Sequence, residues 1–176
     1  MDFHKLVQLR RSYRKFTGEP VDAAQLKLIL EAGLMSPAGK RKNPWRFIVI
    51  EDRETLKALS TAKAQGALPI AGAAAAIAVT ANPADSDTWI EDLSISAIIM
   101  QLQAQELGLG SVWIQMRLRD DENGQPASRN CARILGLPEG TETLCVIALG
   151  HPDEERKPYD LEKLSWEKVS GLNLKS

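Results

Sequence analysis

Residues 85–116 constrain the fold most, because they predict one long helix with two separate apolar faces. One stripe has apolar residues three or four positions apart: Ile90, Leu93, Ala97, Met100, Ala104 and Leu107. A second set lies about 150° around the same helix and consists of Ile95, Ile98, Ile99 and Leu102. Two apolar faces require two partners, which are either two parts of one domain or one domain and a second subunit.

Capping signals mark both ends of this helix. Thr88 and Glu91 have the spacing of a capping box, which predicts the start of the helix. Gly108 and Gly110 predict its end, just before a short β-like run at residues 111–114. We therefore expect the helix to lead directly into a strand.

The rest of the chain predicts further helices and strands without a dividing linker. Helices are expected at residues 2–9, from residues 20–22 to about 34, at 52–64 and at 128–135. Strands are expected at residues 46–50, in the second half of 72–80, at 111–114 and at 141–150. The apolar tail at residues 161–176 is too short to form its own core, so it should dock on another surface. We expect a single domain over residues 1–176.

The composition excludes several classes of function. The chain has 22 basic and 23 acidic residues, and a net charge of -1 argues against nucleic acid or an anionic membrane as a partner. The amino terminus is too charged for a signal peptide and no apolar run could span a bilayer, which predicts a soluble cytoplasmic protein. Cys131 and Cys145 lack the spacing of metal ligands, so we expect buried free thiols and no metal site.

Three cation-bearing turns are the candidate binding features. They comprise Arg10, Arg11, Ser12 and Arg14 near the amino terminus, residues 36–45, and residues 151–158. The guanidinium groups of arginine and a hydroxyl suit a phosphate group, although the first segment taken alone favours a solvated basic turn. The sequence has no nucleophile elbow and no zinc-protease motif. Trp45 and Trp113 adjoin Gly- or Pro-rich loops, and this combination favours a phosphorylated, flat organic cofactor.

Four segments in chain order resemble the nitroreductase family of FMN-dependent oxidoreductases. They are residues 10–14, Ser36-Pro37-Ala38-Gly39 followed by Asn43-Pro44-Trp45, residues 108–114, and Gly150-His151-Pro152 with a basic residue after it. Each segment is weak alone, but their order and spacing are specific and cover nearly the whole chain. The resemblance implies an α+β fold, a nitroreductase-like three-layer α/β/α arrangement with a central mixed, mostly antiparallel sheet flanked by helices. It also implies a homodimer with FMN at the interface.

The resemblance implies cofactor contacts for individual residues. The FMN phosphate and ribityl chain are expected to contact Arg10, Ser12 and Arg14, with Arg156 or Lys157. The polar edge of the isoalloxazine is expected to contact Arg11 and Asn43. The expected partner-subunit loop near the flavin contains Pro37, Ala38 and Gly39. The residues expected along one face of the ring, with a backbone N–H near flavin N5, are Trp113, Ile114, Gln115 and Met116.

The implied activity is an FMN-dependent oxidoreductase. NADH or NADPH would reduce the flavin at N5 and leave, and a nitroaromatic, quinone-like or other electron-poor acceptor would then take the electrons in a ping-pong sequence. No side chain is expected to be catalytic, because flavin N5 carries the chemistry. Two alternatives stay open: a flavoprotein of this fold with different redox chemistry (ring oxidation, dehalogenation or flavin modification), and a non-catalytic nucleotide-binding protein.

A homodimer also gives the two-faced helix a second partner. We expect the stripe from Ile90 to Leu107 to form the dimer seam and the opposite face to pack on the subunit's own sheet. Leu164, Trp166 and Val169 in the tail are suited to reach the other subunit.

Overall fold

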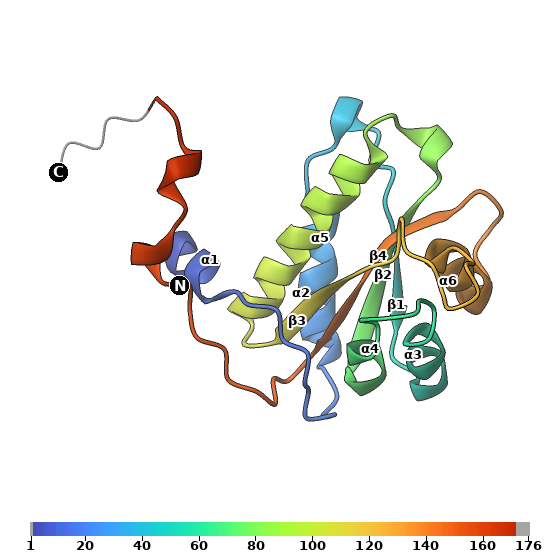
Figure 1. Cartoon of the computed structure of the whole chain (residues 1–176), viewed down its shortest axis with the longest axis horizontal. Helices are drawn as coiled ribbons and strands as arrows, with labels where there is room; N and C mark the ends of the chain where they lie inside the picture. The colour runs from blue at the N-terminus through green and yellow to red at the C-terminus, as the bar shows by residue number, and fades with distance from the viewer. Residues whose placement is uncertain (1, 172–176) are drawn as a thin grey trace.

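A four-stranded antiparallel sheet forms the centre of the computed structural model, which describes residues 2–171 (Figure 1). The strand order is β1-β2-β4-β3, with β1 at Arg46–Ile50, β2 at Ala75–Ala81, β3 at Gly110–Gln115 and β4 at Glu142–Gly150. Every residue of β2 is buried, and so are all but the first residue of β4. The two central strands are therefore covered on both faces.

Helices cover the two faces of the sheet in separate layers. One face is covered by α2 (Ala23–Leu34) and α5 (Trp89–Glu106), the other by α3 (Arg53–Leu59), α4 (Pro69–Gly72) and α6 (Ala127–Leu135). Alternate residues of β2 divide between the two cores: Ile77 packs with α2 and α5, whereas Ala76 and Ala78 pack with the other layer. The expected three-layer α/β/α arrangement is confirmed.

Helix α1 (Phe3–Leu9) stands apart from the sheet beside the carboxy-terminal segment, which contains the short turns η3 (Leu161–Lys163) and η4 (Trp166–Lys168) (Figure 1). Leu164, Trp166 and Val169 are exposed on this chain. Residues 172–176 of the expected tail lie outside the described residues. No helix within residues 2–171 is long and apolar enough to cross a membrane.

The outer edge of β3 receives residues that follow α1. Ser12 forms a parallel bridge with Ser111, and the N–H of Tyr13 donates to the Ser111 carbonyl at 3.0 Å. Gly110 allows this approach, because a Cβ there would lie 2.9 Å from the Tyr13 side chain. The parallel bridge on an antiparallel sheet agrees with the mixed, mostly antiparallel sheet that we expected.

Most predicted elements are present, but α3 ends earlier than expected. It stops at Leu59 rather than near residue 64. The Ser60 hydroxyl donates to the Lys57 carbonyl at 2.7 Å, and the Thr61 hydroxyl donates to the Ala58 carbonyl at 2.8 Å. These side chains take over carbonyls that a longer helix would have used, which ends the helix.

The start of α5 also differs from the prediction, because the Thr88 and Glu91 capping box does not form. The Thr88 side chain makes no capping bond and instead donates through Oγ1 to Oδ2 of Asp92 at 3.1 Å. Asp92 is buried, so its carboxylate requires donors and recruits the hydroxyl that would have capped the helix.

The assignment of the two faces of α5 was wrong. Four residues of the stripe expected at the dimer seam are buried within this chain: Leu93, Ala97, Met100 and Ala104. Helix α2 covers this stripe closely, since Gly33 leaves room for the Met100 side chain where a Cβ would lie 2.8 Å from it. The opposite face is the accessible one, with Ile95 and Ile98 38% and 39% exposed.

Candidate functional site

The amino-terminal basic segment and the last basic turn lie side by side, although they are far apart in sequence. The N–H of Asp153 donates to the Lys15 carbonyl at 3.0 Å, and the N–H of Thr17 donates to the His151 carbonyl at 3.0 Å. Further along, the N–H of Tyr159 donates to the Gln8 carbonyl at 2.9 Å. This pairing brings the cations of residues 10–14 next to Arg156 and Lys157.

Glu154 joins the two segments through both of its carboxylate oxygens. Oε1 accepts from the backbone N–H groups of Arg14 at 2.5 Å and Lys15 at 3.3 Å, and Oε2 lies 2.7 Å from Nη2 of Arg156. Burial raises the pKa of Glu154, but the hydrogen bonds from Arg14 and Arg156 and the charge of Arg156 together hold that pKa below its ordinary value. Glu154 is therefore a charged link that fixes the last turn against the basic segment.

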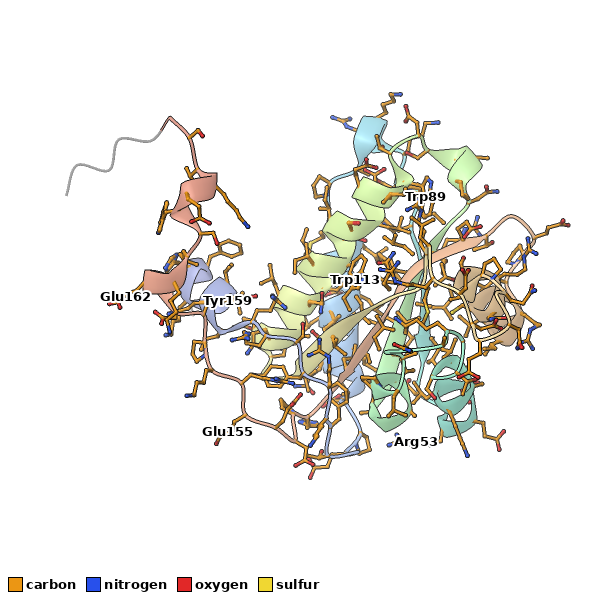
Figure 2. The ribbon with its side chains drawn as sticks, in the orientation of Figure 1. Arg53, Trp89, Trp113, Glu155, Tyr159 and Glu162 are labelled. Carbon is orange, nitrogen blue, oxygen red and sulfur yellow. The ribbon has the colours of Figure 1, made fainter. Side chains whose placement is uncertain are left out.

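The guanidinium groups of Arg156 and Arg11 differ in whether their nitrogen atoms have hydrogen-bond partners. Nε of Arg156 is buried and has no hydrogen-bond partner within residues 2–171. Arg11 donates to the Lys157 carbonyl and lies over the Tyr159 ring, 4.8 Å from its centroid. Figure 2 shows Tyr159 beside α1, where its hydroxyl also lies 3.5 Å from Nη2 of Arg10. A buried donor without a partner is unusual, and an anionic group at Arg156 would satisfy it.

Between Ser111 and the Gln115 carbonyl, no residue within 2–171 pairs with the outer edge of β3. Alternate residues of an antiparallel edge strand direct their backbone groups away from the sheet, and in β3 these are Ser111, Trp113 and Gln115. The outward groups of Trp113 and the outward N–H of Gln115 make no hydrogen bond within the part of the chain that the structure describes. This edge therefore offers backbone donors and an acceptor directly next to the basic segment.

Side chains of the four residues expected along the flavin ring point to both faces of the sheet. Ile114 and Met116 are buried in the core with α3 and α6. Their backbone groups are also engaged within the chain, since Ile114 pairs with Val146 of β4 and the N–H of Met116 donates to the Leu144 carbonyl at 3.1 Å. Trp113 is half-buried next to α5, and its Nε1 donates to Oε1 of Gln115 at 2.9 Å. The Gln115 amide in turn donates to the Arg117 carbonyl at 2.8 Å, which locks the end of the strand.

The loop at residues 36–43 is held in an unusual conformation. Lys40, Arg41 and Asn43 all have positive φ angles of 47–55°, which residues other than glycine rarely adopt. Its anchor is Gly39, whose N–H donates to Oδ1 of Asp92 on α5 at 2.8 Å. Pro37 and Asn43 are exposed beside this anchor. The loop is thus held against α5, with Pro37 and Asn43 on the surface.

Within one chain, this loop lies away from the basic segment. Gly39 is anchored to Asp92 at the beginning of α5, whereas Ser111 accepts from Gln101 at 3.3 Å near the other end. Gln101 follows Asp92 by nine positions along the helix, a rise of roughly 13 Å. The structure therefore brings together the residues expected at the phosphate and at the β3 edge, but not Pro37, Ala38, Gly39 and Asn43.

Sequence reasoning missed two acidic residues that organise the site. Glu154 was visible as an acid within a basic turn, and Asp92 as a charged residue beside the apolar stripe of α5. An acidic residue at either position indicates a carboxylate that accepts hydrogen bonds from specific neighbouring donors. The thiols of Cys131 and Cys145 are buried and free, as expected, and burial raises the pKa of Cys131 to about 12.

Together, the fold and the site define a three-layer α/β/α protein in which two basic segments lie side by side at one edge of its sheet. The chain belongs to the nitroreductase family, whose model matches residues 7–87 and 69–151. This match spans the basic segment, the loop at residues 36–43, β3 and the start of the last turn.

Individual relatives resemble the chain over almost its full length. An FMN-dependent nitroreductase from Clostridium difficile R20291 has a TM-score of 0.91 and 39% identity, covering 96% of this chain and 98% of its own. An Archaeoglobus fulgidus protein that carries the name NADH dehydrogenase/NAD(P)H nitroreductase is 33% identical to this chain over 162 residues, which cover 90% of each chain. A nitroreductase-type structure from Desulfovibrio desulfuricans, solved in complex with FMN, has a TM-score of 0.77 and 25% identity, covering 97% of this chain and 96% of its own.

Proposed function

We propose that this chain is an FMN-dependent oxidoreductase that uses NADH or NADPH to reduce electron-poor acceptors such as nitroaromatics and quinones. One observation carries the proposal: in a chain of the nitroreductase family, the segments that contain Arg10, Ser12, Arg14 and Arg156 lie side by side, and Ser12 pairs with Ser111 at the outer edge of β3. The full-length likeness to an FMN-dependent nitroreductase supports the same activity.

The residues present fit a flavin mononucleotide. Guanidinium groups and a hydroxyl suit its phosphate, and the buried, unpartnered Nε of Arg156 supplies a donor that lacks an acceptor within residues 2–171. The outward N–H of Gln115 and the backbone groups of Trp113 are suited to polar atoms of a flat ring. Arg10, Ser12, Arg14 and Arg156 or Lys157 would hold the phosphate end, and β3 the ring.

When bound, FMN would supply the two-electron redox chemistry between a nicotinamide donor and the acceptor, in the proposed ping-pong order. The chain's own residues bind and orient the cofactor, and the proposed mechanism requires no proton transfer by a side chain of the site. Cations beside the ring favour its negatively charged form, and Arg11 is a candidate for this role by its charge, although within this chain its guanidinium donates to the Lys157 carbonyl and lies over Tyr159. Lys40 is a weaker candidate, because it pairs with Asp87 at 3.1 Å on the surface.

The complete site is proposed to form in a homodimer. The loop containing Pro37, Ala38 and Gly39 lies too far from the basic segment of its own chain, so a second copy would supply it. The exposed Ile95 and Ile98 face of α5 is apolar and unpartnered in one chain, which suits an interface between copies. The exposed apolar residues of the carboxy-terminal segment suit the same role.

A visible spectrum with anaerobic reductive titration tests the activity. We expect the purified protein to bind FMN and its flavin absorbance to bleach when NADH or NADPH is added, then to return with a quinone. Absence of FMN uptake would contradict every flavin assignment and leave an anion- or nucleotide-binding protein. Bound flavin that neither nicotinamide bleaches would instead favour a flavoprotein with different redox chemistry.

A further inference from the structure

Lys63 reaches the outer edge of β3 from the helical layer that contains α3, α4 and α6. Its Nζ donates to the carbonyl of Gln115 at 2.9 Å. That carbonyl is the last outward backbone group of β3, directly beyond the uncovered groups of Trp113 and Gln115. A single ammonium group therefore stands at one end of the open edge, opposite the end that the basic segment covers.

The backbone on both sides of Lys63 is fixed. The carbonyl of Ala62 accepts from Nδ2 of Asn130 on α6 at 3.1 Å, and the N–H of Ala64 donates to the Asp120 carbonyl at 3.0 Å. Asn130 is itself held, because its amide also donates to Oδ2 of Asp121 at 3.0 Å. Lys63 thus projects from an anchored segment rather than from a free loop, which defines where its charge lies.

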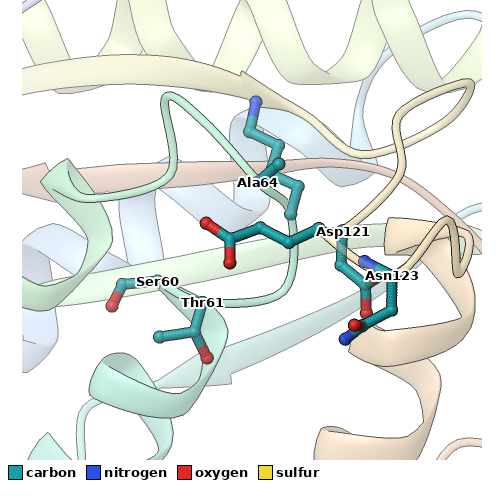
Figure 3. Close-up of a pocket in the computed structure, with 7 residues that line it drawn as sticks. Ser60, Thr61, Ala64, Asp121 and Asn123 are labelled. Atoms are coloured by element: carbon teal, nitrogen blue, oxygen red, sulfur yellow. The ribbon is translucent and has the colours of Figure 1, made fainter.

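Lys63 forms no ion pair within the part of the chain that the structure describes. Within residues 2–171 no carboxylate oxygen lies within 4.0 Å of its Nζ. The hollow beside it, about 340 Å³ in volume, is lined by Ser60, Thr61, Asp121, Glu122 and Asn123 among others (Figure 3). Asp121 is committed elsewhere, since its carboxylate accepts from Asn130 and from the backbone N–H groups of residues 123 and 125.

Partial burial also strengthens the electrostatic interaction of the Lys63 ammonium group with nearby charges. Burial, followed by the charge of Arg119, lowers the pKa of Lys63, while Cys131 acts in the opposite direction. A partly desolvated ammonium group interacts more strongly with nearby charge than an exposed one. Its bond to the Gln115 carbonyl is charge-assisted and holds that peptide group in one direction.

We infer that Lys63 is a positioning residue of the cofactor site, which fixes the end of β3 and sets a positive charge that favours two-electron-reduced FMN over oxidised FMN. The inference rests on the proposed function. Reduced FMN is the more negatively charged of the two forms, so a cation beside the β3 edge binds it more strongly. Neither the residue type nor its position in a polar loop marks Lys63 in the sequence, because the contact with Gln115 exists only in the fold.

Two neutral variants and two charged controls test the inference. Lys63→Met removes the charge and the hydrogen bond at similar length, and Lys63→Gln removes the charge while keeping a donor. Lys63→Arg keeps the charge, and Lys57→Met removes an exposed lysine of α3 as the matched control. For each variant, FMN affinity is measured by fluorescence quenching and the two-electron midpoint potential by dye equilibration, with circular dichroism to verify folding.

We expect Lys63→Met and Lys63→Gln to weaken the preference for reduced FMN by about tenfold, which is a midpoint potential about 30 mV more negative. Lys63→Arg and Lys57→Met should stay near the wild-type potential. A wild-type potential in both neutral variants would overturn the inference, even if they bind FMN less tightly, because a purely structural role moves affinity alone. Failure of the wild-type chain to bind FMN would instead overturn the proposed function and the inference with it.

Discussion

The backbone N–H of Gly39 donates to Oδ1 of Asp92 at 2.8 Å, and this contact ties the loop at residues 36–43 to the first turn of α5. Asp92 is only 3% exposed and also accepts from the hydroxyls of Thr88 at 3.1 Å and Ser86 at 3.3 Å. A buried carboxylate with three donors is a strong local constraint. It explains how the loop keeps three residues with positive φ angles in place.

Replacing this carboxylate should destabilise the protein. Asp92→Asn removes the charge and one acceptor oxygen, leaving a buried donor unsatisfied, and should lower the free energy of unfolding by about 1–3 kcal/mol. Urea denaturation followed by circular dichroism measures the change. Asp87→Asn is the control, because Asp87 is exposed and pairs only with Lys40, and it should leave the urea midpoint unchanged.

The space around Gly39 gives a second prediction. A Cβ at Gly39 would overlap Oγ1 of Thr88, so Gly39→Ala should displace the loop and cost about 1–3 kcal/mol of unfolding free energy. Gly72→Ala is the matched control, because nothing lies within 4 Å of a Cβ there, and it should be neutral or stabilising by up to about 1 kcal/mol. Thermal denaturation of both variants is sufficient, and equal midpoints would contradict the tight packing at Gly39.

Removal of two cations should weaken FMN binding without unfolding the protein. The Arg10→Ala/Arg14→Ala double variant loses charge-assisted donors to the phosphate, so its dissociation constant for FMN should rise on the order of 100-fold. Stability should change little, because surface cations contribute little to it. Lys27→Ala/Lys57→Ala removes two exposed lysines elsewhere and controls for net charge. Full flavin retention by the arginine variant would remove these residues from the phosphate site.

The link through Glu154 predicts a pH dependence of stability. Because the pKa of Glu154 is lower in the folded chain than in the unfolded chain, where it is about 4.3, its contribution is complete above that pH. The contribution should be lost as the pH falls through the lower folded value. Glu154→Gln should therefore lose less stability than wild type between about pH 5 and pH 3. Urea midpoints across this range measure the difference, with the exposed Glu155→Gln as control.

The accessible face of α5 predicts the dimer contact. Ile98→Glu places a charge on that face, and burial of an unpaired charge in an interface should weaken the dimer roughly tenfold or more. Sedimentation velocity over a range of micromolar concentrations should then show monomer. Leu68→Glu, at an exposed apolar position before α4, should leave the wild-type distribution unchanged. A wild-type chain that is monomeric at these concentrations would contradict the proposed homodimer.

The local pattern predicted the elements well wherever one physical cause dominates. Strand β1 at Arg46–Ile50 and helix α6 at Ala127–Leu135, ended by the left-handed Gly136, follow from apolar runs and glycine conformation. The prediction failed at Thr88, because its hydroxyl donates to the buried carboxylate of Asp92. It failed at Ser60, because its hydroxyl donates to the Lys57 carbonyl in the last turn of α3. The two apolar faces of α5 were recognised, but the face expected to be buried within the chain is the exposed one, and the face expected at the dimer seam is buried.

The sequence by itself determined the kinds of groups at the candidate site, because arginines, a hydroxyl and glycine-rich turns are set by residue type. Only the tertiary structure decided which of them meet: Glu154 joins residues 14 and 156, and Lys63 reaches Gln115 across the edge of the sheet. It also decided that α2 covers the Leu93 and Met100 side of α5 and leaves Ile95 and Ile98 exposed. Periodicity shows that a helix has two apolar faces, but which face is buried depends on the elements that pack against it.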